Sequence, residues 1–390
     1  MIKTLAVFLF AALLSGCSTL SNFGASIFGG EDNSEPPAKL ETLVDEVKLK
    51  KLWSASVGVG YDGQFINLVP AASYDQVFVA DREGRVDAFD IETGKRNWKV
   101  ETETAISAGP GTDEGLVVVG TSDAYILALD ATNGDLLWKA RVSSEVLSVP
   151  KIDFGKIIVQ TTDGNITALS AADGEQLWIF DRSVPALTLR GTSTPAIDSG
   201  LVVAGFSNGK LVGISAEKGF AVWETSVAIP SGRSEIERMV DIDGDPVIVG
   251  GAIYVTTFQG RIAVINVKNG NSGWKRDMSS YAGLDVDFSQ VYVTDDTSQV
   301  WALTRSSGSS VWKLDQLQHR SLTAPVYFDQ YVAVGDFEGY VHLLSRQDGH
   351  IAGRVKVDSK GISTRPRVIN DILYVYGDGG KLAAYVLSDR

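Results

Sequence analysis

The sequence has little of the residues that most often build disulfide frameworks, metal centres and histidine- or cysteine-based catalysis. Among its 390 residues there are one cysteine and three histidines. A single cysteine excludes an internal disulfide, and His319, His342 and His350 form neither an H-x-x-x-H pair nor a zinc-binding spacing. No G-x-S-x-G elbow and no phosphate-binding glycine loop occurs in the chain. The sequence therefore predicts a protein that is not an enzyme and that holds no cofactor and no metal ion.

Positive charge is also in the minority. Lys and Arg number 35 against 48 Asp and Glu, which gives a net charge of −13. Such a surface repels phosphate backbones and anionic lipid headgroups, so nucleic acid is excluded as a partner, and it favours solubility. The 11 prolines and 21% charged residues argue against extensive disorder, while 44% hydrophobic residues supply a core for one large domain or two ordinary ones.

The first residues, MIKTLAVFLFAALLSGCS, have the three-part layout of a secretory signal. Lys3 precedes an apolar run, Leu5–Leu14, that is too short to cross a bilayer as a permanent helix. The following LSGC resembles the bacterial lipobox, which implies a signal peptide over residues 1–16 and a lipidated Cys17. Ser18 in place of Asp implies sorting to the outer membrane, where several acyl chains give a stable anchor. The alternative is an ordinary buried cysteine in a plain signal peptide.

The segment after the cysteine is rich in Gly, Ser, Asn, Pro and acidic residues and has no sustained period. This composition is typical of a flexible tether. We therefore expect a lipidated N-terminus and tether over residues 17–47 and a globular domain over residues 48–390. The lipid anchor alone would hold that domain at the periplasmic face of the outer membrane.

One short pattern recurs through the rest of the chain and in its fullest form reads A-x-D-x-x-x-G-x-x-x-W. The copies are AFDIETGKRNW (88–98), ALDATNGDLLW (128–138), ALSAADGEQLW (168–178), GISAEKGFAVW (213–223), VINVKNGNSGW (264–274) and ALTRSSGSSVW (302–312). A seventh copy, LLSRQDGHIAG (343–353), has Gly353 in the tryptophan position, and an eighth begins at AAYVLSDR (383–390). Each copy follows a β-branched run and a turn, as in VFVADREGRV, which is typical of an antiparallel meander.

A period of about 40 residues built from four short strands indicates a β-propeller. The last copy has no tryptophan, whereas Leu52-Trp53-Ser54 stands alone near the start without a repeat before it. If the N-terminal strand completes the last blade, Trp53 becomes that blade's tryptophan and the ring has no open edge. The predicted fold is all-β: an eight-bladed propeller of four-stranded antiparallel blades, closed by the N-terminal strand.

The repeated tryptophan is best explained as a structural contact. At the end of an outer strand it can dock into the adjacent blade, bury a large area and donate its N–H to a backbone carbonyl. The glycine of the motif permits a tight turn before it. A cofactor-stacking role is the alternative, but these tryptophans serve every blade alike.

The regular spacing of the repeat also shows where residues are inserted. From each tryptophan to the next turn residue the ordinary spacing is 26, as from Trp138 to Gly164, whereas it is 31 from Trp178 to Gly209 and 37 from Trp223 to Gly260. These two insertions are consecutive and occupy the same part of the repeat, so we expect them to be neighbours on one rim, where binding loops are common. The spacing from Trp53 to Gly84 is also 31, so length alone does not single them out.

The two insertions carry different chemistry. The first, SVPALTLRGTSTP (183–195), places Leu187 and Leu189 beside Arg190, a combination typical of an interface anchor. The second, IPSGRSEIERMVDIDGDP (229–246), contains Asp241 and Asp243 close to arginines. The alternative for the second loop is a solvated surface with internal ion pairs. A D-x-D-x-D calcium loop is disfavoured because a proline replaces the required glycine and an alanine replaces the bidentate acid.

The pattern resembles two families. It is similar to the tryptophan-docking motif of the quinoprotein dehydrogenases, which makes a periplasmic pyrroloquinoline-quinone enzyme the alternative function, although those enzymes are longer and often have a cysteine pair at the cofactor. The whole chain resembles more strongly the BamB family, lipoprotein subunits of the outer-membrane β-barrel assembly (BAM) machinery. The segments ALTLRG (186–191) and SEIERMVDID (234–243) resemble the loops with which that family contacts the BamA subunit.

The second resemblance implies a non-enzymatic scaffold within the BAM complex. Its partner would be the periplasmic domains of BamA, and it would assist the assembly and insertion of β-barrel outer-membrane proteins, which could also contact it as unfolded clients. By position, the resemblance makes Leu187, Leu189, Arg190, Asp241 and Asp243 the partner-binding candidates. A glycan-binding envelope propeller is a third hypothesis.

Overall fold

Alternating apolar residues and glycine turns fold into short strands along the whole of the repeat region. The structure, a computed structural model, describes residues 35–185, 187–189 and 191–388, and all regular secondary structure in these ranges is β-strand. Within the described part, no helix is long and apolar enough to cross a membrane. The signal peptide and Cys17 lie outside the described residues and stay predictions.

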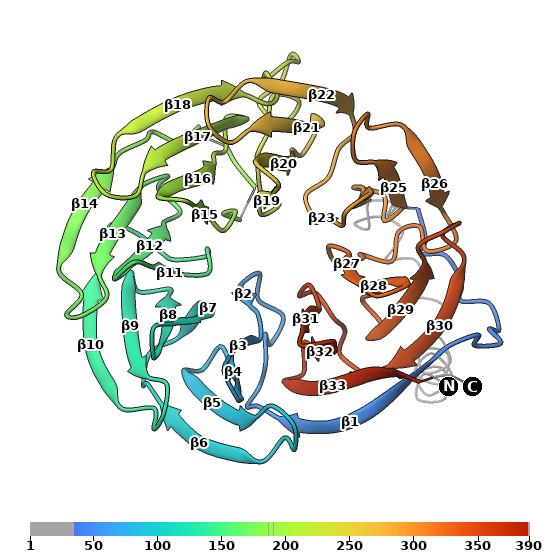
Figure 1. Ribbon diagram of the computed structural model, residues 1–390, viewed down its shortest axis with the longest axis horizontal. Coiled ribbons are helices and arrows are strands. Elements are labelled where there is room, and N and C mark those ends of the chain that lie inside the picture. The colour runs from blue at the N-terminus through green and yellow to red at the C-terminus, as the bar shows by residue number, and fades with distance from the viewer. Residues whose placement is uncertain (1–34, 186, 190, 389–390) are drawn as a thin grey trace, which may run out of the picture. The chain divides into compact units, whose positions relative to one another are not determined.

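Eight sheets follow one another around a ring, and each runs from an innermost to an outermost strand (Figure 1). Blades 1 to 4 contain, in order, β3 (Ala71–Ser73), β4 (Gln76–Ala80), β5 (Arg85–Asp90), β6 (Arg96–Glu101); β7 (Ile106–Asp113), β8 (Leu116–Thr121), β9 (Tyr125–Asp130), β10 (Leu136–Arg141); β11 (Lys151–Asp153), β12 (Lys156–Gln160), β13 (Ile166–Ser170), β14 (Gln176–Phe180); β15 (Ala196–Asp198), β16 (Leu201–Gly205), β17 (Lys210–Ser215) and β18 (Ala221–Ser226). Blades 5 to 7 contain β19 (Val247–Val249), β20 (Ala252–Thr256), β21 (Arg261–Asn266), β22 (Ser272–Asp277); β23 (Gly283–Val286), β24 (Gln290–Thr294), β25 (Val300–Thr304), β26 (Ser310–Leu314); β27 (Val326–Phe328), β28 (Tyr331–Gly335), β29 (Tyr340–Ser345) and β30 (Ile351–Lys356).

Blade 8 joins the two ends of the propeller. Its inner strands are β31 (Arg367–Ile369), β32 (Ile372–Tyr376) and β33 (Lys381–Ser388), and its outermost strand is β1 (Lys48–Ser56). β1 pairs antiparallel with β33, and Figure 1 shows it in blue along the outside of the red β33. The predicted eight-bladed propeller, closed by the N-terminal strand, is confirmed.

The repeated tryptophans connect each blade to the next one around the ring. Each indole N–H donates to a backbone carbonyl of the following blade at 2.8–3.1 Å: Trp53 to Ile91, Trp98 to Ala131, Trp138 to Ala171, Trp178 to Ala216, Trp223 to Val267, Trp274 to Arg305 and Trp312 to Arg346. The predicted structural role of these tryptophans is therefore confirmed. Loss of one should cost about 3–5 kcal/mol, since it removes a large aromatic contact between sheets.

The glycine of the motif has a second purpose that the pattern alone did not indicate. Gly134 has a positive φ of 80°, as a tight turn requires, and a Cβ added there would lie 2.7 Å from the indole of Trp98 in the preceding blade. The corresponding glycines of the other blades meet the preceding tryptophan in the same way: Gly94, Gly174, Gly219, Gly270, Gly308 and Gly349. Turn and indole are therefore matched, because only a residue without a side chain leaves room for the ring.

Blade 7 has no tryptophan, and a different part of the chain covers the vacant position. The N–H groups of Glu46 and Val47 donate to the carbonyl of Ala352 on β30 at 2.7 and 3.3 Å. A Cβ added to Gly353 would lie 2.6 Å from the carbonyl oxygen of Val47. The glycine that replaces the tryptophan thus makes room for the N-terminal segment.

Residues 38–47, which the sequence analysis assigns to the tether, contact the propeller closely. Leu40 packs against the apolar cluster between blades 6 and 7, and the guanidinium of Arg320 donates to the carbonyl of Ala38 at 2.8 Å. Arg354 donates through its side chain to the carbonyl of Glu41 and through its backbone N–H to Asp45, both at 3.2 Å. These contacts fix the segment from Ala38 onward, and the flexible tether stays a prediction for the residues before it.

The long connection between Trp53 and Gly84 turns into the ring. Its strand β2 (Asn67–Leu68) pairs in parallel with β7 and makes blade 2 five-stranded, as the position of β2 in the centre of Figure 1 shows. Leu68 is fully buried, and Tyr61 is buried and donates its hydroxyl to the carbonyl of Leu68. This connection therefore belongs to the interior of the propeller.

Candidate functional site

The two insertions that the repeat spacing identified lie against each other. The backbone N–H of Leu189 donates to Oδ2 of Asp241 at 2.5 Å, and that of Thr194 donates to Oδ1 of Asp245 at 2.7 Å. A Cβ added to Gly191 would lie 3.0 Å from Oδ1 of Asp243. Both insertions connect an outermost strand to the innermost strand of the next blade, so they share one rim, and the expectation that they are neighbours is confirmed.

The five partner-binding candidates occupy different environments. Leu187 is exposed at 42%, Leu189 and Asp243 are half-buried, and Asp241 is fully buried. Arg190 lies outside the described residues. Asp241 acts within the protein, since its carboxylate holds the backbone of Leu189 and its carbonyl accepts the N–H of Phe258 at 2.8 Å. The exposed candidate is therefore Leu187, while Asp241 shapes the loop that presents it.

Burial leaves the two aspartates poorly solvated. It raises the pKa of Asp241 to about 6, and the hydrogen bond from Leu189 opposes this rise. Burial also raises the pKa of Asp243 to about 7, with a further contribution from the charge on Asp241. Oδ1 of Asp241 and Oδ2 of Asp243 are buried without a hydrogen-bond partner among the described residues. A buried carboxylate of this kind favours the approach of a cation or a hydrogen-bond donor.

The tip of the second insertion exposes apolar side chains that the sequence analysis did not single out. Ile229 and Ile236 are 76% and 62% exposed. In the same turn, the carboxylate of Glu237 accepts the backbone N–H of Arg233 at 2.6 Å, and Arg238 pairs with Glu235. The predicted alternative of internal ion pairs thus holds for Arg238, but the exposed isoleucines add apolar surface beside it. They were present in the quoted loop, and only their exposure was missing.

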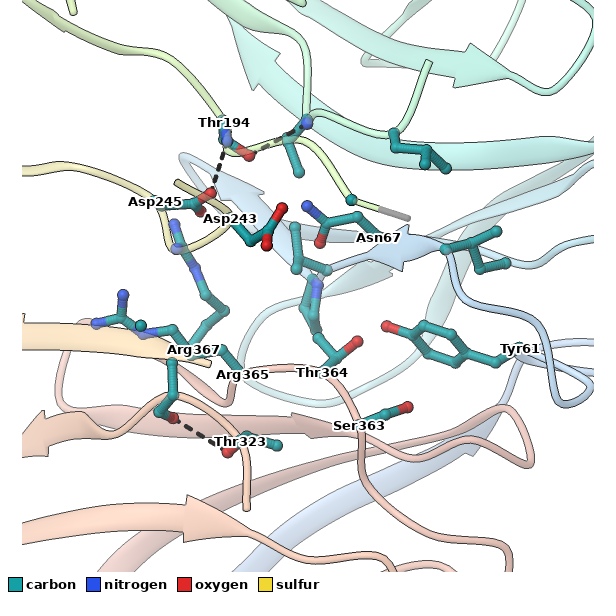
Figure 2. Close-up of a pocket in the computed structure, with 18 of the residues that line it drawn as sticks. Tyr61, Asn67, Thr194, Asp243, Asp245, Thr323, Ser363, Thr364, Arg365 and Arg367 are labelled. Atoms are coloured by element: carbon teal, nitrogen blue, oxygen red, sulfur yellow. Dashed lines mark hydrogen bonds between the residues drawn. The ribbon is translucent and has the colours of Figure 1, made fainter. Parts of the chain in front are cut away.

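A cavity of about 1350 Å³ occupies the centre of the ring, and the leading segments of all eight blades line it. Leu189 and Asp243 reach its wall from the rim, and Figure 2 shows Asp245 beside the side chains of Arg365 and Arg367. The repeat pattern does not indicate this cavity, because its wall consists of residues far apart in the chain. The length of the Trp53–Gly84 connection was the one available signal, since that connection supplies part of the wall.

Comparisons with known proteins agree with this architecture. The family model described as "Outer membrane protein assembly factor BamB" matches residues 50–314. The BamB protein of Pseudomonas aeruginosa is 49% identical over 365 residues, covering 93% of this chain and 96% of that protein, and the BamB protein of Marinobacter adhaerens is 48% identical over 375 residues, covering 96% and 93%.

Two solved structures have a similar fold to this chain but differ in how similar their sequences are to it. The crystal structure of BamB from Moraxella catarrhalis has a TM-score of 0.80 and 29% identity, and the match covers 87% of this chain and all of that one. A quinohemoprotein alcohol dehydrogenase from Comamonas testosteroni has a TM-score of 0.69 at 13% identity, which shows a shared fold alone. The comparisons support the assembly-factor interpretation and not the dehydrogenase alternative. The chain belongs to the BamB family of outer membrane protein assembly factors.

Proposed function

We propose that this chain is a non-enzymatic scaffold of the BAM complex that binds the periplasmic domains of BamA. It would be lipid-anchored through Cys17 at the periplasmic face of the outer membrane and would assist the assembly and insertion of β-barrel proteins there. The observation that carries the proposal is the contact between the two overlong connections on one rim. Membership of the BamB family supports it, since the related proteins are named as outer membrane protein assembly factors.

The chemistry of this rim suits a specific protein interface. Leu187, Ile229 and Ile236 are exposed apolar anchors on neighbouring loops, and burial of such anchors supplies most of the binding free energy of an interface. The carboxylate of Asp243 is half-buried and has a raised pKa, so a cation from the partner would find it already partly desolvated. A ring whose blades are fixed by tryptophans presents these groups in a constant arrangement.

Purification from detergent-solubilised envelopes tests the surface. Arg190→Glu and Asp243→Arg should abolish co-purification with BamA, and Leu187→Glu should do so without disturbing the core, because that side chain is exposed. Asp123→Arg is the matched control, since Asp123 is an exposed aspartate in a short turn of blade 2 on the same rim. Tryptophan fluorescence and Tm report whether each variant folds. Unchanged co-purification of the folded variants would reject the assigned surface.

A second role, binding of extended clients, rests on the outer edge of the ring. The outermost strands β10, β14 and β18 are sheet edges, and each exposes large apolar side chains: Leu136, Leu137, Leu177, Ile179 and Val222, with Phe220 directly before β18. The chain itself supplies a precedent, because Glu46 and Val47 donate to the edge strand β30. We infer that unfolded outer-membrane proteins add to such edges by backbone hydrogen bonding.

Site-specific photo-crosslinking tests the client role. A crosslinking residue at Leu137 should capture an unfolded outer-membrane protein, whereas the same residue at Asp123 should not. Equal capture at both positions, or none at Leu137, would argue against strand addition. Because neither position belongs to the two insertions, this outcome is separable from the result for BamA.

A further inference from the structure

The wall of the central cavity contains four cations, Lys151, Lys360, Arg365 and Arg367, and five aspartates, Asp62, Asp113, Asp243, Asp245 and Asp378, and three of the cations lie close together. Lys151 opens the innermost strand of blade 3, and Arg367 opens that of blade 8. Both side chains line the cavity, as does Arg365. Although 216 positions apart in the chain, Lys151 and Arg367 are close enough for each to be affected by the charge on Arg365 and for Arg367 to act on Lys151. Ring closure alone brings these cations together.

The carboxylates beside them are too few and are already engaged. Asp285 pairs with Arg365 at 2.8 Å and accepts the backbone N–H of Tyr327 at 2.7 Å. Asp245 attracts both Lys151 and Arg367, but its Oδ1 accepts the N–H of Thr194. The cluster therefore holds three cations against two carboxylates.

Within the described part of the chain, Lys151 and Arg367 lack a direct counter-ion. Neither side chain forms a hydrogen bond or an ion pair with another described residue. Burial lowers the pKa of both groups, and the neighbouring guanidinium groups lower it further. Asp243, on the same wall, does not compensate them, since burial and the charge on Asp241 raise its pKa. Unpaired cations in a half-buried position cost stability, so their presence calls for a function.

The wall near these cations contains threonines and serines and also apolar side chains. Val149 and Ile152 flank Lys151 in sequence, Ile369 follows Arg367, and all three line the cavity. The volume exceeds what one inorganic ion needs and suits a small organic molecule. We propose that the central cavity binds a small amphipathic organic anion, whose carboxylate lies between Lys151 and Arg367 and whose apolar body lies against Val149, Ile152 and Ile369.

Titration calorimetry with three probes tests both halves of the ligand. Octanoate carries a carboxylate on an apolar body, octanol has the same body without charge, and acetate has the charge without the body. We expect saturable binding of octanoate to one site on the full-length protein and affinities at least about tenfold weaker for octanol and acetate. Equal binding of octanol, or no saturable binding of octanoate, would overturn the proposal.

Substitutions locate the site. Lys151→Met and Arg367→Met should each weaken octanoate binding by about tenfold, since each removes a charged hydrogen-bond donor. Lys275→Met and Arg141→Met remove the same charges from exposed positions on outer strands and should leave the affinity unchanged. Equal weakening by the exposed substitutions would overturn the proposal, because it would reduce the effect to net charge.

Thermal unfolding distinguishes a binding site from a structural ion cluster. Without ligand, Lys151→Met and Arg367→Met should keep Tm or raise it by about 2 °C, because an unneutralised charge is removed. Octanoate should raise the Tm of the unsubstituted protein and not that of the two variants. Lys151→Arg, which keeps the charge, should retain octanoate binding. A lower Tm in both methionine variants together with loss of binding in Lys151→Arg would make the cluster structural. Neither cation belongs to the proposed BamA surface, so this result stands apart from that function.

Discussion

Two connections of this propeller have the same length, but one lies inside the ring and the other lies on its rim. From Trp53 to Gly84 and from Trp178 to Gly209 the spacing is 31 residues. The first connection enters the ring, where β2 joins blade 2 and Leu68 is fully buried, whereas the second stays on the rim with Leu187 exposed. An insertion measured by length can therefore be part of the core or part of a binding surface.

The hydrogen-bond partners of the two connections explain the difference. Within the inward connection, Tyr61 donates its backbone N–H to the carbonyl of Asp378, and β2 pairs with the backbone of β7, so fixed strands and turns of the ring hold it. Within the rim connection, Leu189 and Thr194 donate to carboxylates of the next insertion. Two loops that support each other through side chains can adjust to a partner, while a segment paired with the ring cannot.

The largest expected effect comes from the inward connection. Leu68→Ala removes a fully buried side chain between blades and should lower the free energy of unfolding by about 2–5 kcal/mol. Urea unfolding followed by tryptophan fluorescence measures this loss. Co-purification with BamA should persist under conditions where the variant is folded. If Leu68→Ala instead lost BamA at unchanged stability, the division between core and surface would be wrong.

The next largest effect concerns the rim, where a substitution should weaken binding and leave stability nearly unchanged. Leu187→Glu should weaken BamA binding by about 2 kcal/mol or more, as expected for an anchor at an interface, and should change stability by no more than about 0.5 kcal/mol. Surface-immobilised binding to the periplasmic domains of BamA gives the affinity, and thermal unfolding gives the stability. Val184→Glu, at a similarly exposed residue of the same connection, maps how far the interface extends.

The raised pKa of Asp243 predicts how the rim responds to pH. Its folded value of about 7 lies above its ordinary value of 3.8, so the native state binds more protons than the unfolded state between these limits. This carboxyl therefore supports stability most at low pH, and its contribution is lost as the pH rises to about 7. Asp243→Asn should be more stable than the unsubstituted protein at pH 8 by on the order of 1–2 kcal/mol and should gain little at pH 4. Urea unfolding at both pH values measures this difference, and a gain equal at both would contradict it.

The repeat pattern predicted most of the ring, because its determinants are local. The tryptophans, the turn glycines and the unpaired Trp53 recur at fixed spacing, and spacing alone placed the two rim insertions side by side. The inward turn of β2, the packing of residues 38–47 over Gly353 and the meeting of Lys151 with Arg367 depend on surfaces that exist only after the ring has closed. In the sequence, Lys151 and Arg367 are each a single cation at the start of a short strand. The role of Arg190 and the other partner-binding candidates stays a prediction that rests on the family resemblance.

The smallest expected effect on stability is a deletion in the rim. Residues 230–237 are all exposed; the bond from Arg233 to Glu237 lies within this segment, and Glu235 pairs with Arg238 directly after it. Removing these eight residues shortens an exposed loop, and the entropy of loop closure changes by only about 0.6 kcal/mol per halving of loop length. The deletion should therefore leave Tm nearly constant while it removes Ile236 and weakens BamA binding.

Removal of residues 62–65 from the inward connection is the matched test, because the shortened chain could no longer carry both Tyr61 to blade 8 and β2 to blade 2. If the two deletions changed Tm equally, the contribution of a connection to stability would depend on its length and not on whether it lies inside the ring or on the rim.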